Sequence, residues 1–329
     1  MDVDAFIAVH RSDWQRLDEL VGRRRLDGAE SDELLVLYQR VSTHLSIIRS
    51  VDPESALSGA LSTRLSRART RFTGARSNTM EDIAQFFVFS LPAAFYRIRW
   101  LTVAVGLVFV AVAWLYAFWV GTPGVIQALG PDEELWRYVE EDFVDYYSEN
   151  PAASFAGLVW TNNAWIAVQA VAFGVTGIWP VFILYQNAQG VGMAAGMMAS
   201  YDRLDTFFLY ILPHGFMELT AIFIATAAGL RIFWAWVAPG RRTRAAALAE
   251  EGRALITVAL GLVLVLLVSG LVEGFVTPSG LPPWLRLTIG FLVLGAYWAY
   301  TLILGRRAVA AGHRGDLGAV DRGDAVVTA

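Results

Sequence analysis

The most apolar run of the chain, residues 254–272, limits most strongly what the sequence can fold into. It holds no charged side chain. As an α-helix rising about 1.5 Å per residue, it is long enough to cross the hydrocarbon core of a bilayer, about 30 Å thick. The hydrophobic share of 56% and the mean hydropathy of +0.47 exceed those of ordinary soluble domains. The sequence therefore predicts a membrane protein.

Further apolar runs extend this prediction to an all-α, polytopic helical membrane protein with about six transmembrane segments. Residues 183–200 are only weakly hydrophobic and can instead form a re-entrant pair of half-helices, which is tolerated where the backbone is buried in protein or lines a wet cavity. The transmembrane domain is expected over residues 101–305. The expected crossings are residues 101–120, 162–182, 183–200, 206–236, 254–272 and 284–304.

The distribution of arginine predicts the orientation of these segments. Residues 1–100 hold 14 Arg, whereas residues 121–160 hold Arg137 alone beside eight carboxylates. Short cytoplasmic loops carry an excess of basic residues. We therefore expect a multi-pass protein of the cell membrane with both termini in the cytoplasm. The first 30 residues also lack the continuous apolar core of a cleavable signal peptide.

The remaining segments are amphipathic or polar. Residues 1–79 show three stripes of apolar residues at helical spacing, which predicts a cytoplasmic three-helix domain. Residues 80–100 are rich in aromatic residues and end in arginines, as in an amphipathic elbow helix at the inner membrane surface. Residues 131–150 predict an external amphipathic helix, and residues 306–329 a flexible cytoplasmic tail.

The segment LYILPHGFMEL places ionisable groups inside an apolar run. His214 and Glu218 are four residues apart and share one helix face. Ionisable residues within a membrane are costly and often functional, although this pair can also serve only to satisfy one another. The expected intramembrane polar pocket comprises Asn162, Asn163, Asn187, His214, Glu218 and Glu273.

Proline and glycine residues near these polar groups are predicted to kink helices and let them approach closely. The glycines of GVGMAAG do not match a dinucleotide-binding motif, because their spacing differs and no strand precedes them. The residues assigned to kinks and packing are Pro180, Pro213, Gly215, Gly192 and Gly196.

Several chemistries are disfavoured by the residues that the sequence lacks. There is no cysteine, no HExxH, no Walker loop and no GxSxG motif. A catalytic zinc would require His214, Glu218 and Glu273 to supply all three protein ligands. No catalytic residue, cofactor or metal is therefore predicted. The acidic residues of the N-terminal region also argue against a nucleic-acid partner.

Four stretches in order resemble the stage II sporulation protein M family of integral membrane proteins: TNNAWIAVQAVAFGVTGIWP, YQNAQGVGMAAG, LPHGFMELTAIFIATAAGLRI and VEGFVTPSGLP. The namesake in endospore formers resembles a scaffold that anchors peptidoglycan-degrading partners. The use of Arg without Lys is similar to actinobacterial members. The matching residues carry no assigned chemistry: Asn162, Asn163, Asn187, Pro213, His214, Gly215, Glu218 and Glu273.

These observations predict a non-enzymatic membrane scaffold and homodimer that recruits protein partners on its cytoplasmic and external faces. Cell-envelope or peptidoglycan-remodelling factors are the expected partners besides the lipid bilayer. The alternative is a transporter or channel-like protein that uses an outward-facing pocket around His214 and Glu218. The two differ in whether substitution of the pocket residues abolishes flux of a solute or proton.

Overall fold

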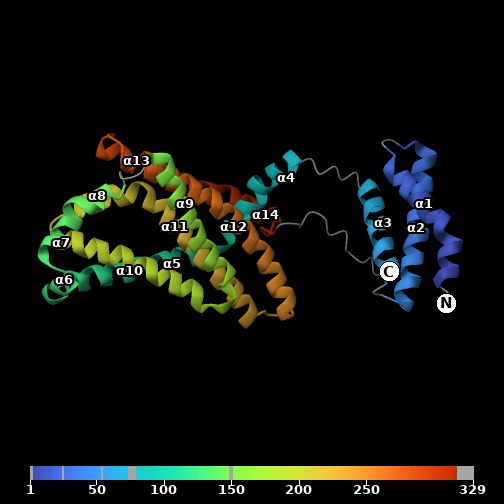
Figure 1. Ribbon diagram of the computed structural model, residues 1–329, viewed down its shortest axis with the longest axis horizontal. Helices are drawn as coiled ribbons and strands as arrows, with labels where there is room; N and C mark the ends of the chain where they lie inside the picture. Colours follow the sequence, from blue (N-terminus) through green and yellow to red (C-terminus); the bar gives the residue numbers. More distant parts are fainter. Residues whose placement is uncertain (1–2, 24–25, 53–54, 73–78, 148–150, 317–329) are drawn as a thin grey trace. The chain divides into compact units, whose positions relative to one another are not determined.

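The computed structural model describes residues 3–23, 26–52, 55–72, 79–147 and 151–316, and within them the chain is helical without a β-strand. It divides into two compact units, Met1–Asp82 and Ile83–Ala329, called here the N-terminal unit and the membrane unit. Figure 1 shows their helices, which are described separately below.

The N-terminal unit is a bundle of three helices, α1 (Val3–Gly22), α2 (Gly28–Val51) and α3 (Ala56–Phe72). A capping box starts α2, because the Asp27 side chain accepts from the Glu30 backbone and the Glu30 side chain accepts in return. The apolar stripes of the three helices meet in one core of Trp14, Leu17, Leu20, Leu34, Leu37, Val41, Leu45, Ile48, Leu61, Leu65 and Ala68.

Ion pairs connect the helices of this bundle at its surface. Arg16 of α1 donates to both carboxylate oxygens of Glu33 in α2, at 2.9 and 2.8 Å. Arg64 of α3 donates to Asp18 of α1 at 2.8 Å. Such exposed pairs each stabilise a protein by less than about 1 kcal/mol, so the apolar core holds the bundle together.

The membrane unit is built from long helices packed side by side. Four of them are long and apolar enough to cross a membrane: Asp82–Val120, Leu204–Val237, Arg244–Phe275 and Pro283–Ala310. Its main helices are α5 (Leu91–Val120), α9 (Ala152–Ala172), α10 (Ile178–Ser200), α11 (Leu204–Val237), α12 (Arg244–Phe275) and α13 (Pro283–Ala299). Shorter elements are α4 (Thr79–Gln85), α6 (Pro123–Leu129), α7 (Asp132–Arg137), α8 (Phe143–Asp145) and α14 (Gly305–Ala310).

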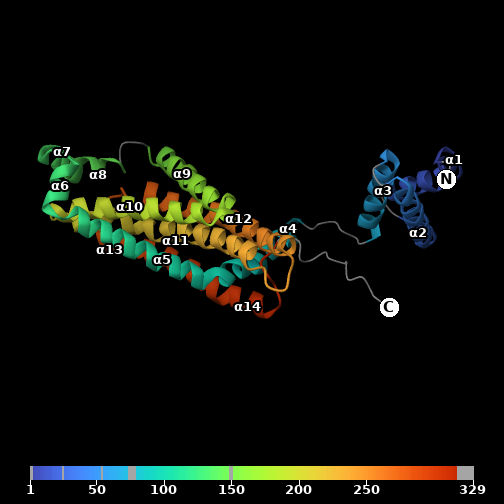
Figure 2. The ribbon, with the colours of Figure 1, turned by 90° about the horizontal axis from the view of Figure 1, so that it is seen from below.

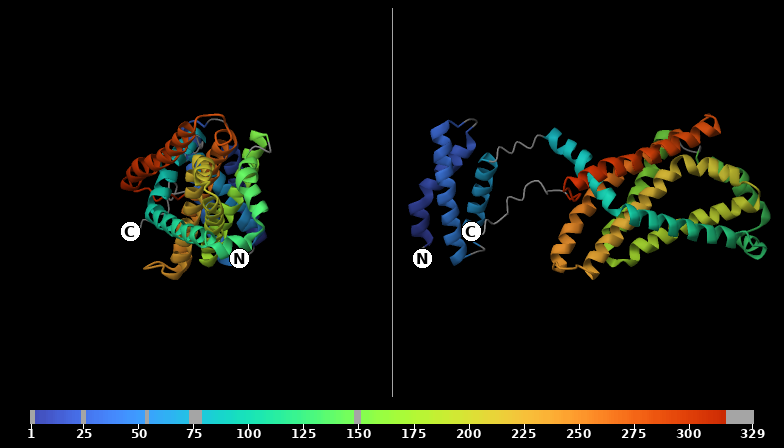
Figure 3. Two further views of the ribbon diagram at one scale, coloured as in Figure 1. Left: turned by 90° about the vertical axis from the view of Figure 1, so that its left-hand side faces the viewer. Right: turned by 180° about the vertical axis from the view of Figure 1, so that it is seen from behind.

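Helix α11 occupies the centre of the membrane unit and contacts α5, α9, α10, α12 and α13. Figures 2 and 3 show these helices from further directions. Small residues permit the close approach. A Cβ atom on Gly229 of α11 would lie 2.5 Å from the Ala170 carbonyl oxygen of α9 and 2.8 Å from Pro180 of α10. A larger residue at this crossing would therefore separate three helices.

The prediction of six crossings is not matched by the four candidate spans, and the difference lies in α9 and α10. Their connection, residues 173–177, lies earlier than the expected boundary at residues 182 and 183. Gly177, with a φ of +69°, precedes α10. Pro180 consequently stands in the first turn of α10 and does not kink a span, since proline is tolerated there. Helix α10 is continuous and contains no pair of half-helices.

The segments expected at the membrane surfaces also differ in detail. The expected elbow is continuous with the first crossing, because helical structure extends without interruption from Asp82 to Val120. Residues 132–147, the acidic segment, bury Val139, Phe143 and Tyr147 against Phe155 and Phe207. Trp136 of the same segment is exposed. Residues 148–150 lie outside the described part of the chain.

The C-terminal segment is held against the membrane unit as far as Asp316. Helix α14 packs on α5, where a Cβ atom on Gly315 would lie 2.5 Å from the Ala94 backbone nitrogen. The Arg97 guanidinium donates to the Arg314 carbonyl oxygen at 2.5 Å. Of the tail expected to be flexible, residues 306–316 are thus bound to the unit, and residues 317–329 lie outside the described residues.

Candidate functional site: a buried polar cluster in the membrane unit

Three helices of the membrane unit bring four polar side chains together. His214 and Glu218 lie one turn apart on α11, Glu273 lies near the C-terminal end of α12, and Asn163 lies in the middle of α9. His214 and Glu273 are each only 4% exposed. These four residues are called the polar cluster below.

The orientation of the His214 ring is fixed by Thr277. The Nδ1 atom of His214 lies 3.1 Å from the Thr277 hydroxyl oxygen, and this hydroxyl donates to the Val272 carbonyl oxygen at 3.5 Å. With the hydroxyl donating in this direction, the ring presents its Nδ1 proton to Thr277. The lone pair on Nε2 then faces the Oε1 atom of Glu273, 3.8 Å away.

The two carboxyl groups of the polar cluster lie next to one another. Glu218 interacts with the side chains of both Glu273 and Asn163. The Oε2 atom of Glu273 is buried and has no hydrogen-bond partner among the described residues. Two ionised carboxylates in a dry site repel one another strongly, so the cluster requires a proton or a cation to balance its charge.

Two further side chains lie around this cluster. The Tyr147 ring lies 5.8 Å from the His214 ring, and burial, together with the Glu273 and Glu218 carboxylates, raises the pKa of the Tyr147 phenol. Tyr147 is therefore an uncharged hydroxyl group at neutral pH. Arg286 of α13 donates to the Thr277 carbonyl oxygen at 2.6 Å and lies over the Tyr210 ring, so it connects α13 to the segment that orients His214.

The backbone around His214 is held by neighbouring helices. Ser269 of α12 donates to the His214 carbonyl oxygen at 3.1 Å. Pro213 lies inside α11, and a Cβ atom on Gly290 of α13 would lie 2.6 Å from the Pro213 carbonyl oxygen. Gly215 is buried in the same turn. These contacts fix the position of the turn of α11 that presents His214.

The structure brings Asn163, His214, Glu218 and Glu273 together, but it separates two other residues from the expected pocket. Asn162 is exposed, and Asn187 donates to the Ile183 carbonyl oxygen of its own helix. The expected place of the asparagine pair at a helix start is wrong, because α9 begins at Ala152. Gly192 and Gly196 instead lie against α5, next to Ala113 and Ala117.

Sequence reasoning missed Thr277, Tyr147 and Arg286 as neighbours of His214. Arg286 gave a signal, because it is a charged residue in the first turn of an otherwise apolar helix. Thr277 lies four residues after Glu273, a spacing that places it nearby if the helical turn continues. Nothing local in the sequence points Tyr147 toward α11.

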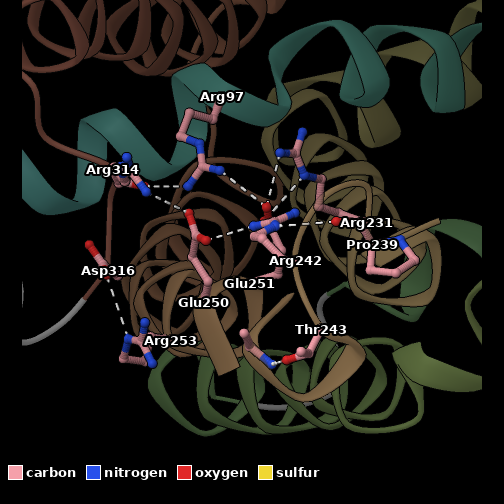
Figure 4. Close-up of polar contacts among 11 residues, drawn as sticks. Arg97, Arg231, Pro239, Arg242, Thr243, Glu250, Glu251, Arg253, Arg314 and Asp316 are labelled. Atoms are coloured by element: carbon pink, nitrogen blue, oxygen red, sulfur yellow. Dashed lines mark hydrogen bonds and ion pairs between the residues drawn. The ribbon is translucent and has the colours of Figure 1, made fainter. Parts of the chain in front are cut away.

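A second charged group lies at the opposite end of α12, around Glu251, which is 6% exposed. Its carboxylate accepts from Arg97 of α5 at 3.2 Å and from Arg231 of α11 at 3.1 and 3.2 Å (Figure 4). The adjacent Glu250 accepts from Arg242 at 2.6 Å and from Arg314 at 3.0 Å. These pairs connect three spanning helices and the C-terminal segment.

These features define an α-helical membrane protein with four candidate spanning helices and a buried cluster of one imidazole, two carboxyl groups and one amide. Residues 99–278 match the family described as Stage II sporulation protein M. Since this match covers more than half of the chain, the protein belongs to that family, and the predicted resemblance is confirmed. Residues 4–74 match a family described as Domain of unknown function (DUF8413). No curated protein and no solved structure matches the chain.

Proposed function

We propose that this protein is a non-enzymatic membrane scaffold that recruits partner proteins, among them cell-envelope or peptidoglycan-remodelling factors. Its arrangement in the plasma membrane comprises six crossings with both termini in the cytoplasm. Helices α9 and α10 supply the two crossings beyond the four candidate spans. Each is long enough to cross, and the connection at residues 173–177 is short.

The observation that carries this proposal is an apolar row on the outer side of α2. Val36, Ile47 and Val51 are 46%, 36% and 51% exposed. They are separated by about three turns and about one turn and so lie near one helix face, opposite the face that buries Leu34 and Val41 in the bundle core. The core of the N-terminal unit is complete without this row. A partner helix with a complementary apolar stripe would cover it.

The acidic segment supports a second recruitment surface on the external side. It contains seven carboxylates between residues 132 and 145. Arg203 of the turn between α10 and α11 donates to Glu140 at 2.6 Å and fixes the segment on the membrane unit. Those carboxylates of the acidic segment that are not paired within the membrane unit present negative charge to basic partners.

The homodimer is supported by the low burial of two spanning helices. In the apolar stretches of Asp82–Val120 and Pro283–Ala310, only 17% of the residues are buried, whereas the value is 50% in Leu204–Val237. These two helices therefore present large faces to lipid or to a second copy. Mass photometry of the full chain in nanodiscs measures the oligomeric state, and a single-copy mass at all concentrations contradicts the dimer.

The scaffold is tested by placing a photo-crosslinking residue at Ile47 in cells and identifying the proteins attached to it. Leu35 is a matched control, since it is 47% exposed on the same helix but faces another direction. We expect adducts from position 47 and not from position 35. Val36→Ser should abolish them while Leu35→Ser leaves them intact. Equal adducts from both positions, or none, contradict recruitment through this face.

The polar cluster favours a second candidate function, a transporter or channel-like protein. Asn163, His214, Glu218 and Glu273 lie together within the apolar helices, where such groups often mark ion or proton pathways. Reconstitution into liposomes tests this function. Loss of a measured solute or proton flux in His214→Ala, with adducts from position 47 unchanged, favours transport over the scaffold.

A further inference from the structure

We propose that the polar cluster binds a divalent transition-metal ion of the zinc type, with the Nε2 atom of His214 and one carboxylate oxygen each from Glu218 and Glu273 as ligands. The proposal goes beyond the scaffold function and does not depend on it. It also differs from the expectation of no metal drawn from the sequence, because only the folded chain brings Glu273 to the other two residues.

The ligand atoms lie close enough for one ion. A nitrogen of His214 and an oxygen from each of Glu218 and Glu273 lie within 4.8 Å of one another. Zinc binds nitrogen and oxygen at about 2.0–2.2 Å in a tetrahedron, so the ligand atoms around one ion lie about 3.4 Å apart. The distance of 3.8 Å between His214 and Glu273 exceeds this separation by about 0.4 Å. The remaining adjustment is within the reach of a glutamate side-chain rotation.

Two of the three ligands share a helix face at a spacing of four residues. His214 and Glu218 both lie on α11, and this spacing lets helices in known zinc sites hold two ligands on one ion. Glu273 comes from α12, which packs along α11. Two ligands from one helix and a third from its neighbour restrict the ion to a single position.

Thr277 prepares His214 for metal binding. A metal-binding histidine usually donates its other ring proton to a neighbouring acceptor, which fixes the ring and its tautomer. Here the Nδ1 proton is directed at the Thr277 hydroxyl at 3.1 Å, and the Nε2 lone pair is left facing the carboxylates. Thr277 is therefore a positioning residue, since it would act on the ion only through His214.

The unpartnered oxygen of Glu273 is an independent indication of a ligand. Glu273 is 4% exposed, and its Oε2 atom is buried without a hydrogen-bond partner among the described residues. An unsatisfied buried carboxylate oxygen is costly. A divalent cation satisfies it and supplies two positive charges against the two carboxylates.

The nature of the donors selects the class of ion. Imidazole nitrogen favours zinc and its transition-metal neighbours, whereas magnesium and calcium prefer oxygen ligands alone. Three protein ligands also leave one coordination position of zinc open. Asn163, which interacts with Glu218, and Tyr147, whose ring lies 5.8 Å from His214, are the further polar side chains around the cluster.

The N-terminal unit contains a second histidine and carboxylate group, His10, Asp13 and His44, whose geometry does not suit a metal. Trp14 donates its indole proton to the Nδ1 atom of His44 at 3.2 Å. An Nδ1 atom that accepts this proton leaves the proton of the neutral ring on Nε2. Neither nitrogen of His44 then has a lone pair available for a metal ion. Substitutions of His10 and Asp13 are therefore controls for the site in the membrane unit.

The test uses the full chain, purified without a polyhistidine tag, stripped with a chelator and incorporated into nanodiscs. Zinc binding is measured by mass spectrometric metal analysis and by competition with a chromogenic chelator. We expect one zinc per chain. Glu273→Gln and His214→Gln should weaken binding by about tenfold or more, while His10→Gln and Asp13→Asn leave it unchanged. Thr277→Val should weaken it similarly, and Thr277→Ser should restore it.

Cobalt(II) provides a readout on the unmodified chain, so the test does not depend on the folding of any variant. Co²⁺ bound in the cluster should give visible absorption bands that zinc abolishes and magnesium does not, and zinc should raise the melting temperature. Less than about one tenth of a zinc per chain in the stripped and reloaded protein, with no cobalt bands, overturns the proposal. Zinc binding by folded His214→Gln and Glu273→Gln proteins that equals binding by the unmodified chain also overturns it. A proton shared between the carboxylates then remains the explanation of the cluster.

Discussion

The Nε2 atom of His214 and the Oε1 atom of Glu273 lie 3.8 Å apart although they belong to different helices of the membrane unit. This carboxylate comes from α12 and not from the helix that carries His214. The helical repeat explains why His214 and Glu218 share a face, but only the packing of α12 against α11 places a second carboxylate there. The site therefore depends on tertiary packing.

The first prediction concerns this pair in chelator-treated protein. Glu273→Ala removes a buried group that faces this imidazole and should lower the free energy of unfolding by about 1–3 kcal/mol, because a buried polar group loses its partner. The double variant with His214→Ala should recover part of that loss. A thermal-shift double-mutant cycle in detergent measures the coupling between the residues. Additive effects of the two substitutions would show that these side chains do not interact.

The second prediction concerns Glu251 at the other end of α12. Glu251→Ala leaves Arg97 and Arg231 without their buried carboxylate, and we expect a loss of about 3 kcal/mol in stability. Asp142→Ala is the control, because it removes an exposed pair with Arg137 worth less than about 1 kcal/mol. Thermal unfolding measures the loss of stability in both variants. Equal melting temperatures would mean that Glu251 does not stabilise the packing of these helices.

The third prediction uses the glycine at the crossing of three helices. Gly229→Ala forces a methyl group against Ala170 and Pro180 and should cost about 1–3 kcal/mol. Gly295 of α13 has no atom within 4 Å of its potential Cβ position. Gly295→Ala should therefore be neutral or stabilise α13 by up to about 1 kcal/mol, since alanine is the better helix former. Scanning fluorimetry compares the two, and a more stable Gly229→Ala protein would refute the packing argument.

The fourth prediction is a pH dependence of the N-terminal unit. Burial, followed by the nearby His10, lowers the pKa of His44 below its usual value of 6.5. The unfolded chain therefore binds a proton at a higher pH than the folded unit does, and stability is lost as the pH falls from about 6.5 through the lower folded pKa. Hydrogen exchange of α1–α3 in the full chain at pH 7.5 and at pH 5 measures this loss.

His44→Gln is the control for that pH dependence. Glutamine keeps a hydrogen-bond acceptor for Trp14 but does not titrate in this range. The difference in exchange between the two pH values should shrink in this variant, apart from general effects of pH that both proteins share. An undiminished difference would assign the dependence to another group.

The fifth prediction concerns the number of crossings. A cysteine replacing Val175, which is 42% exposed in the connection between α9 and α10, should react with an impermeant reagent from the cytoplasmic side. Cysteines introduced into this cysteine-free chain at Thr63 and Glu133, which are expected on the cytoplasmic and external sides, serve as references. Protection of position 175 from both sides would indicate a re-entrant hairpin and four full crossings.

Periodicity and hydropathy predict much of this architecture but not where α9 and α10 meet. The stripe Leu34, Leu37, Val41, Leu45 and Ile48 is buried as its spacing predicts. Residues 152–184, in contrast, are apolar almost throughout, so hydropathy alone does not locate a turn within them. The glycine at position 177, with its positive φ, starts the new helix, and Pro180 is tolerated in the first turn that follows.

The ionisable residues of the candidate site could be predicted from the sequence, but their neighbours could not. His214, Glu218 and Glu273 attract attention because ionisable groups are expensive in an apolar segment. Asn162 and Asn163 were equivalent in the sequence, and only the rotation of α9 about its axis buries one and exposes the other. Thr277 and Tyr147 are common residue types in connecting segments, so their contacts with His214 follow from the tertiary fold alone.

The attachment of residues 314–316 to the first spanning helix has a consequence for biosynthesis. Arg97 is synthesised 217 residues ahead of Arg314, whose carbonyl group it contacts, and Ala94 likewise precedes Gly315. The membrane unit therefore cannot reach its final packing until residue 315 has been synthesised. Until then, the surface around Ala94 stays open to whatever assists insertion.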